Sequence, residues 1–118
     1  MAYPKFIVLK DFQNSIEIRF GFVEFHSDLI KEDDKKHGKS CIGGGLFEIV
    51  DHIKEIWLYG SSTDFGSVDK RILDKIKLTK DNISTLENIE KDNLQADIDY
   101  FKRVKKDLSK YKLVIKNF

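Results

Sequence analysis

One histidine in this sequence stands where it could do acid–base or phosphate chemistry. His26 follows the extended run Phe22–Phe25, and the polar residues Ser27 and Asp28 come directly after it. If a helix starts here, its unsatisfied amides and the positive end of its macrodipole would favour an anion. A histidine beside them could act as a base, a nucleophile or a proton donor near neutral pH. The alternative interpretation is a surface histidine in a turn, which does no chemistry.

Two glycine-containing stretches follow and could complete a binding site. The loop Gly60–Gly66 has the sequence GSSTDFG and comes directly after a strand-like run. Loops with hydroxyls and free amides at a strand end can bind anions, although an ordinary turn explains the same composition. Gly43, Gly44 and Gly45 stand side by side before the next apolar run. Such glycines permit either a positive φ or the close approach of another group.

The remaining histidines and the cysteine do not indicate a second site. His37 lies in a charged stretch, and His52 lies at the expected tip of a hairpin. The three histidines lack the spacing of metal ligands. Cys41 is interpreted as a small packing residue. We therefore expect no metal and no cofactor.

Length and charge restrict the class of protein. The chain has 118 residues, enough for a single domain spanning 1–118 with one core. Its 21 basic and 20 acidic residues nearly cancel, so general attraction to nucleic acid or membranes is not expected. The one cysteine excludes an internal disulfide. Without a signal peptide or an apolar run of about 20 residues, a cytoplasmic monomer is expected.

The hydrophobic pattern predicts an α+β fold with one sheet. Ile16–Phe20 alternates apolar and polar residues, as a strand with one buried face does. Asp51–Lys54 has the length and polarity of a hairpin connector. The expected strands are 5–10, 16–25, 46–50, 55–59 and 111–116.

Three stretches have helical features. After a cap at Ser27, a short helix is expected to end at Gly38. Val68, Ile72 and Ile76 recur every four residues and indicate one apolar helical face. A longer apolar stripe follows a capping-box pattern near residue 84. The expected helices are 28–37 and 84–109.

Three short motifs in a fixed order resemble one family. FVEFHSDLI at 22–30, CIGGG at 41–45 and YGSSTDFG at 59–66 look like the janus/phosphohistidine phosphatase family. The first strand also carries a lysine, Lys5, at the place where the family has one. The resemblance covers about residues 4–70 and the final strand, and it leaves a helical insertion at about 69–93.

The resemblance implies a small mixed, mostly antiparallel sheet flanked by helices, and metal-independent hydrolysis of phosphohistidine or another phosphoramidate. In that family pattern His26 would be the general base or nucleophile, and Lys5 would neutralise the phosphate. Ser62 and the turn amides of Thr63 and Asp64 would hold the phosphoryl oxygens. Arg19 lies upstream of His26 much as a family arginine does.

Two positions depart from the family pattern. Leu46 stands directly after the glycines, where the family has an arginine, and Asp64 replaces a small neutral residue. Both changes make the pocket less positive. Two functions therefore remain open. One is a phosphatase whose partner is a phosphorylated protein or a small phosphoramidate. The other is a non-catalytic domain of the same fold that binds a protein or an anion.

Overall fold

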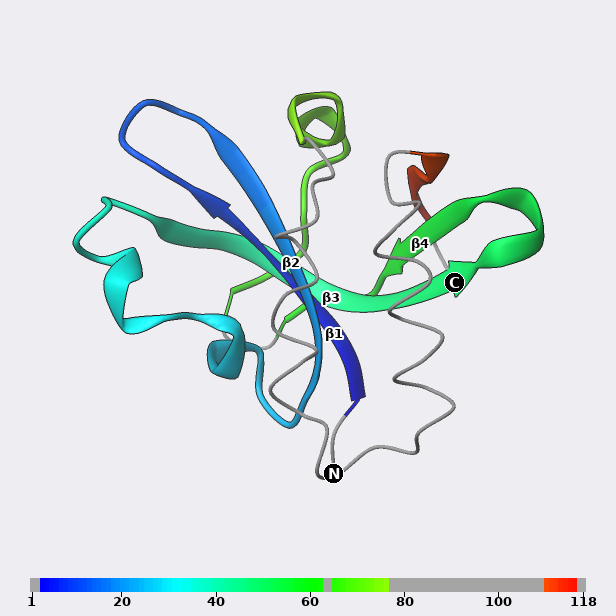
Figure 1. The fold of residues 1–118 in the computed structure, drawn as a ribbon, viewed down its shortest axis with the longest axis horizontal. Helices are drawn as coiled ribbons and strands as arrows, with labels where there is room; N and C mark the ends of the chain where they lie inside the picture. The colour runs from blue at the N-terminus through cyan, green and yellow to red at the C-terminus, as the bar shows by residue number, and fades with distance from the viewer. Residues whose placement is uncertain (1–2, 63–64, 77–109, 117–118) are drawn as a thin grey trace.

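The computed structural model describes residues 3–62, 65–76 and 110–116. They form one curled sheet of five strands in the order β2-β1-β3-β4-β5 (Figure 1). The strands are β1 (Tyr3–Lys10), β2 (Ile16–Val23), β3 (Ser40–Val50), β4 (Glu55–Tyr59) and β5 (Lys112–Ile115). Four 3-10 turns accompany them: η1 (His26–Leu29), η2 (Glu32–Asp34), η3 (Asp51–Ile53) and η4 (Lys70–Lys75).

All five expected strands are present in one mixed sheet. β1 pairs antiparallel with both β2 and β3, β3 pairs antiparallel with β4, and β4 pairs parallel with β5. The hairpin between β3 and β4 closes through η3, as its connector predicts. Two boundaries differ from the expectation. β2 ends at Val23 rather than at residue 25, and β3 begins at Ser40 rather than at residue 46, because the three glycines are part of the strand.

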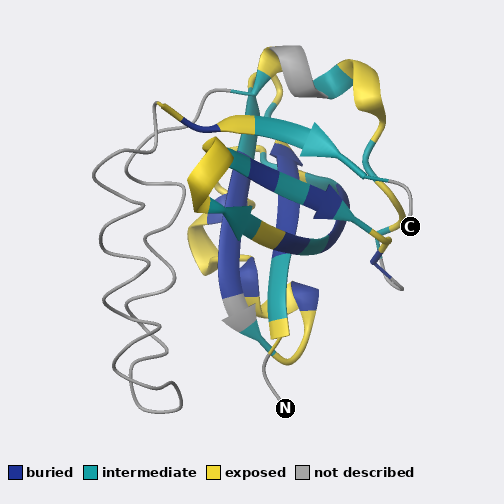
Figure 2. Cartoon of the chain, turned by 90° about the vertical axis from the view of Figure 1, so that its right-hand side faces the viewer, coloured by how far each residue is buried: buried dark blue, intermediate teal, exposed yellow. Residues whose placement is uncertain are grey.

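Both faces of the sheet are covered at β1. Side chains alternate along a strand, so Phe6 and Val8 point into the larger core cluster. Ile7 and Leu9 point to the opposite face, where they pack against Leu29 of η1. Buried residues accordingly lie in β1, in its two neighbours β2 and β3, and at alternate positions of β4 (Figure 2). The turn that contains His26 therefore lies over the smaller of two cores.

The expected helix at 28–37 is wrong, because the chain forms the two turns η1 and η2 there instead. Between them Ile30 and Lys31 are extended, with ψ of 130° and 153°. The side chains of Asp28 and Asp34 accept backbone N–H groups of this segment. Local side-chain bonds of this kind compete with helical hydrogen bonding. The turn Lys35–Gly38 that follows ends at Gly38, whose φ is +67°.

The apolar face at Val68, Ile72 and Ile76 packs on the larger core, as expected, but its central part is the 3-10 turn η4. The expected helix at 84–109 lies outside the described residues, as does most of the insertion at 69–93. No helix in the described part of the chain has the length and apolar character needed to cross a membrane.

Candidate functional site

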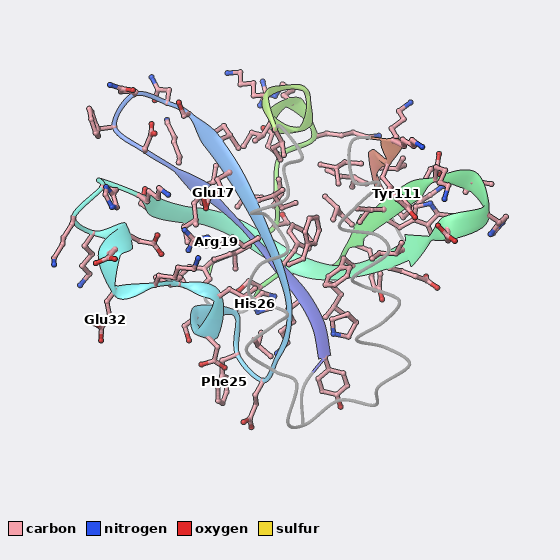
Figure 3. All side chains as sticks on the ribbon, viewed as in Figure 1. Glu17, Arg19, Phe25, His26, Glu32 and Tyr111 are labelled. Atoms are coloured by element: carbon pink, nitrogen blue, oxygen red, sulfur yellow. The ribbon has the colours of Figure 1, made fainter. Side chains whose placement is uncertain are left out.

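His26 is the first residue of η1, and its imidazole is directed toward the sheet (Figure 3). The residue is only 9% exposed, and its Nε2 lies 2.9 Å from the carbonyl oxygen of Gly45. A carbonyl oxygen can only accept a hydrogen bond, so Nε2 must carry the proton. Nδ1 is then the basic nitrogen of the neutral ring. The ring is thus fixed in one tautomer by the backbone of β3.

Gly44 provides the space in which this ring lies. A Cβ atom at Gly44 would stand 3.1 Å from Cδ2 of His26 and 2.6 Å from the carbonyl oxygen of Phe6. The described glycines with positive φ are Gly38, Gly60 and Gly66, so the three glycines of β3 do not serve an unusual backbone conformation. The close-approach interpretation of these glycines is therefore confirmed. The small space beneath the ring explains why the residue under His26 is a glycine, Gly44.

The turn that carries His26 is held by the residues on either side of it. The carboxylate of Asp28 accepts the N–H of Phe25 at 3.0 Å, and the N–H of Asp28 donates to the carbonyl of Phe25 at 3.0 Å. The cap is therefore formed by Asp28 and not by Ser27, which is exposed. Leu29, at the end of the turn, has 0% exposure. These contacts fix the position of the histidine without a long helix.

Lys5 lies on the same face of the sheet as His26. Ile7 pairs with Gly44 in the β1–β3 register, and Lys5 pairs with Leu46 two residues along. Residues two apart on a strand share a face. The ammonium of Lys5 donates to the carbonyl of Glu24. Because an ammonium has three N–H donors, this bond holds the charge near His26 and still allows Lys5 to contact an anion.

Ser62 lies in a turn that is joined to β3 beside His26. Its N–H donates to the carbonyl of Gly66 at 3.1 Å, and the N–H of Gly66 donates back at 2.8 Å. The same carbonyl of Gly66 accepts the N–H of Gly44 at 3.0 Å. Gly60 and Gly66 have φ of +71° and +77°, which explains glycine at both ends of the turn. The turn is therefore bonded to β3 at Gly44, the residue beneath the ring of His26, whereas its flanking residues Gly60 and Ser67 lie close to Gly45 and Gly43.

The hydroxyl of Ser62 serves the turn itself. It accepts the N–H of Phe65 at 3.2 Å, and the residue is 3% exposed. Thr63 and Asp64, the other expected phosphate ligands of this loop, lie outside the described residues. Direct contact between these three residues and a phosphate stays a prediction.

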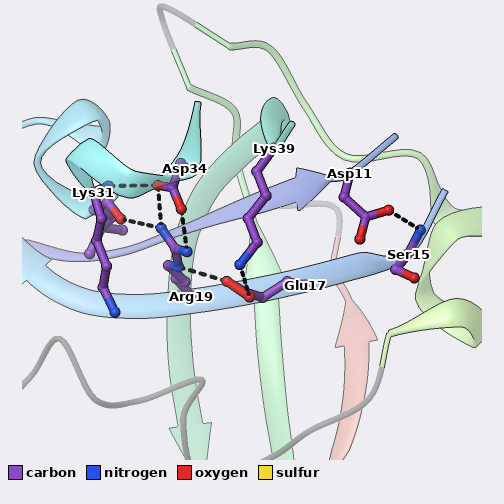
Figure 4. Close-up of polar contacts among 8 residues, drawn as sticks. Asp11, Ser15, Glu17, Arg19, Lys31, Asp34 and Lys39 are labelled. Carbon is purple, nitrogen blue, oxygen red and sulfur yellow. Dashed lines mark hydrogen bonds and ion pairs between the residues drawn. The ribbon is translucent and has the colours of Figure 1, made fainter. Parts of the chain in front are cut away.

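Arg19 occupies a different position from the one its expected role requires. Its Nη1 and Nη2 each lie 2.7 Å from a carboxylate oxygen of Asp34 (Figure 4). Nη1 also donates to the carbonyl of Leu29 at 3.1 Å, and Nε donates to Glu17 at 2.7 Å. The hydrogen bonds from Arg19 hold the pKa of Asp34 below its ordinary value. Arg19 therefore ties η1 and η2 to the sheet instead of facing an anion.

The partner of this arginine could not be found from the sequence. Asp34 stands inside the run KEDDKK, where each carboxylate looks like part of a solvated surface. Arg19 itself lies with Glu17 on the polar face of the alternating run Ile16–Phe20, so the sequence pattern does not signal that it is buried and needs an acid. The partner itself had no sequence signal, because the pairing spans 15 positions along the chain.

The two other histidines and the cysteine are not assigned to this site. His37 and His52 are exposed. Burial raises the pKa of the Cys41 thiol, which favours the packing interpretation. In the described part of the chain, no group of three or more His, Cys, Asp and Glu residues could share a metal ion. A cavity between Phe6, Val68 and the ends of β4 and β5 does not include His26.

A comparison with protein families identifies the group to which this chain is related. The family model described as Janus/Ocnus family (Ocnus) matches residues 13–85, which is more than half of the chain. The matched range includes His26, the glycines of β3 and the loop Gly60–Gly66, whereas Lys5 lies before it. No curated protein matches this chain. By the extent of the family match, the chain belongs to the Janus/Ocnus family.

Proposed function

We propose that the protein is a metal-independent phosphatase that hydrolyses phosphohistidine or another phosphoramidate, with His26 as the general base or nucleophile. One observation carries the proposal. The hydrogen bond from Nε2 to Gly45 leaves Nδ1 as the basic nitrogen, on the face of the sheet that also bears Lys5. A fixed base and a nearby cation are what phosphoryl transfer needs most from a protein.

The chemistry has two forms that use the same atoms. With His26 as a base, Nδ1 takes a proton from water while the water oxygen bonds to phosphorus and the P–N bond breaks. The departing nitrogen then takes up a proton. With His26 as a nucleophile, Nδ1 bonds to phosphorus as the substrate P–N bond breaks, and water later hydrolyses the phosphorylated histidine. In both forms, charge on the phosphoryl oxygens is stabilised by Lys5.

The loop Gly60–Gly66 supports the same proposal in a different way. It is bonded to β3 at Gly44, beneath the ring of His26, and turns of this kind can receive phosphate oxygens. The N–H groups of Ser62, Phe65 and Gly66 donate within the turn, so they shape it and are not counted as phosphate donors. We assign Ser62 to shaping this turn, because its buried hydroxyl accepts the Phe65 amide. Arg19 is not part of the proposed phosphate site, since Asp34 and Glu17 engage its guanidinium.

The test is release of phosphate from a phosphohistidine peptide and from phosphoramidate. His26→Ala should lower kcat/KM by a factor of about 100 or more, the usual contribution of a general base. Lys5→Ala should raise KM through the lost charge. His52→Ala is the matched control, because it removes an exposed histidine at the far hairpin and should leave turnover unchanged. Equal activity of wild type and His26→Ala would refute the proposal.

A non-catalytic binding domain is the second candidate, and one position favours it. Leu46 pairs with Lys5 across β1 and β3, so an apolar side chain stands beside the proposed phosphate cation. One positive charge at this place could bind an anion without supporting its turnover. Phosphate or phosphopeptide binding by wild type, with no release of phosphate over many hours, would favour this second function.

A further inference from the structure

The surface around His26 bears more exposed hydrophobic side chains than a phosphate alone requires. Five large hydrophobic residues are exposed in the described part of the chain. Three of them, Tyr3, Phe25 and Ile30, belong to the start of β1 and to the two ends of η1. The other two lie in the remote turns of the β1–β2 and β3–β4 hairpins. Exposed hydrophobic residues gathered at one place often mark a binding surface.

Two of these residues are linked to the proposed phosphate cation, one through its ring and one through the neighbouring residue. The ring centroid of Tyr3 lies 5.9 Å from Nζ of Lys5, and Tyr3 is 50% exposed. Phe25 directly precedes His26 and is 57% exposed, and Figure 3 shows its side chain pointing away from the sheet while the imidazole points toward it. The carbonyl of Glu24, next to Phe25, accepts the Lys5 ammonium. We call Tyr3 and Phe25 the aromatic rim.

Leu46 adds a further apolar side chain beside Lys5. The two residues are direct cross-strand partners, and Leu46 is half-buried. The ammonium of Lys5 suits a phosphoryl group, whereas the hydrophobic residues near it suit apolar side chains of a ligand. A small phosphoramidate would contact only Lys5. A phosphorylated peptide would contact both Lys5 and the hydrophobic residues.

From this arrangement we propose that the substrate is phosphohistidine within a protein segment whose neighbouring residues are apolar, and that the aromatic rim selects it. The inference rests on the proposed function and narrows it from any phosphoramidate to one class of protein segment. Apolar residues beside the phosphohistidine would cover the rings of Tyr3 and Phe25 and remove their surface from water. Acidic or small polar neighbours would leave the same surface exposed.

The experiment compares two phosphohistidine peptides of equal length and charge, one with Leu and Phe beside the phosphohistidine and one with Ser and Gly. Wild type should prefer the apolar peptide in kcat/KM by about tenfold, a usual size for apolar discrimination. Phe25→Ala and Tyr3→Ala should each reduce this preference several-fold. Phe25→Leu and Tyr3→Leu should largely retain it, because they keep an apolar side chain.

Phe12→Ala is the matched control, since Phe12 is an aromatic residue with 77% exposure in the turn at the other end of β1. It should leave the preference unchanged. A wild-type preference that Phe25→Ala and Tyr3→Ala both leave unchanged would overturn selection by the aromatic rim. Equal kcat/KM for the two peptides, with phosphoramidate still hydrolysed, would overturn the inference that the aromatic rim selects the substrate and leave the phosphatase proposal intact. If wild type hydrolyses neither peptide nor phosphoramidate, the phosphatase proposal fails. The affinities of wild type for the two peptides then test the aromatic rim, and equal affinities overturn its role in selection.

Discussion

Replacing Asp34 by alanine should destabilise this protein more than replacing any other charged residue of the segment 31–39 by alanine. The side chains of Asp34 and Arg19 are 4% and 5% exposed and are joined by two hydrogen bonds of 2.7 Å. Alanine would leave the guanidinium buried without its main counter-charge. Removing one partner of a buried ion pair costs about 3–5 kcal/mol.

This cost is a large share of the stability of a small domain, which is about 5–15 kcal/mol in total. For a chain of 118 residues, each kcal/mol corresponds to about 4 °C in Tm, so Asp34→Ala should lower Tm by roughly 12–20 °C. A further part of the loss comes from the N–H of Lys31, which donates to Asp34 at 2.6 Å and fixes the start of η2. Urea unfolding and thermal unfolding, followed by circular dichroism, would both measure the effect.

Asp33 provides the control within the same turn. Its side chain is 74% exposed, and its ion pair with Lys36 is 3.9 Å long, so Asp33→Ala should change stability by less than about 0.5 kcal/mol. The double variant Arg19→Ala with Asp34→Ala should lose less than the sum of the two single variants, because the unpaired charge is then gone. If Asp34→Ala were no more destabilising than Asp33→Ala, the ion pair would not hold this segment on the sheet.

Three further predictions concern pH, the space under the histidine and the charge of the site. Hydrogen bonds from Arg19 lower the pKa of Asp34 in the folded protein. The stabilisation by the Asp34 carboxylate is therefore present above about pH 4 and is lost as the pH falls further through the lowered pKa. Urea unfolding between pH 7 and pH 2 should show this loss of stability in wild type and not in Asp34→Asn. Gly44→Ala should cost about 1–3 kcal/mol and also reduce turnover at least tenfold, because the new methyl group meets the carbonyl of Phe6 and the ring of His26. Gly43→Ala, whose methyl group meets the carbonyl of Ser67 on the opposite face of the sheet, should lower stability and leave turnover unchanged. Leu46→Arg should tighten phosphate binding by about 1 kcal/mol at low salt and by less at high salt, whereas Leu46→Gln should not tighten it. Phosphate titration, followed by the ring resonances of His26, measures the affinity of both variants. A gain in affinity that does not depend on salt would mean that phosphate binds elsewhere.

The strands could be predicted from the sequence because each has a local signal. Ile16–Phe20 alternates by twos, and the polar connector Asp51–Lys54 marks the hairpin between β3 and β4. The start of β3 could not be predicted in the same way. Three successive glycines favour a loop on composition, but they are in a strand because they pair with Phe6–Val8 of β1. The neighbouring groups leave no room for a Cβ atom, which explains why these strand positions are glycine. That reason lies in the tertiary structure and not in the local sequence.

The segment after His26 has a clear local sequence pattern, but the pattern predicts the wrong structure. A cap-like Ser27, an apolar pair and a terminal Gly38 are a reasonable helix pattern. What decides the outcome is the use of Asp28 and Asp34 as acceptors for backbone N–H groups, together with the buried position of Arg19 on a distant strand. That His26 follows the second strand could be predicted, although the strand ends earlier than expected, at Val23. The means by which it is held could not, since the ion pair joins residues far apart in the sequence.

This difference changes where the positive charge of the site must come from. The sequence predicts three sources of that charge: the N-terminus of a helix after His26, the guanidinium of Arg19, and the ammonium of Lys5. The helix is absent, and η1 has only four residues, so it supplies no long macrodipole. The charge of Arg19 is balanced by Asp34 and Glu17. In the proposed phosphate site Lys5 would therefore supply most of the charge stabilisation, and its removal should affect phosphate binding more than removal of either Arg19 or the loop hydroxyl of Ser62.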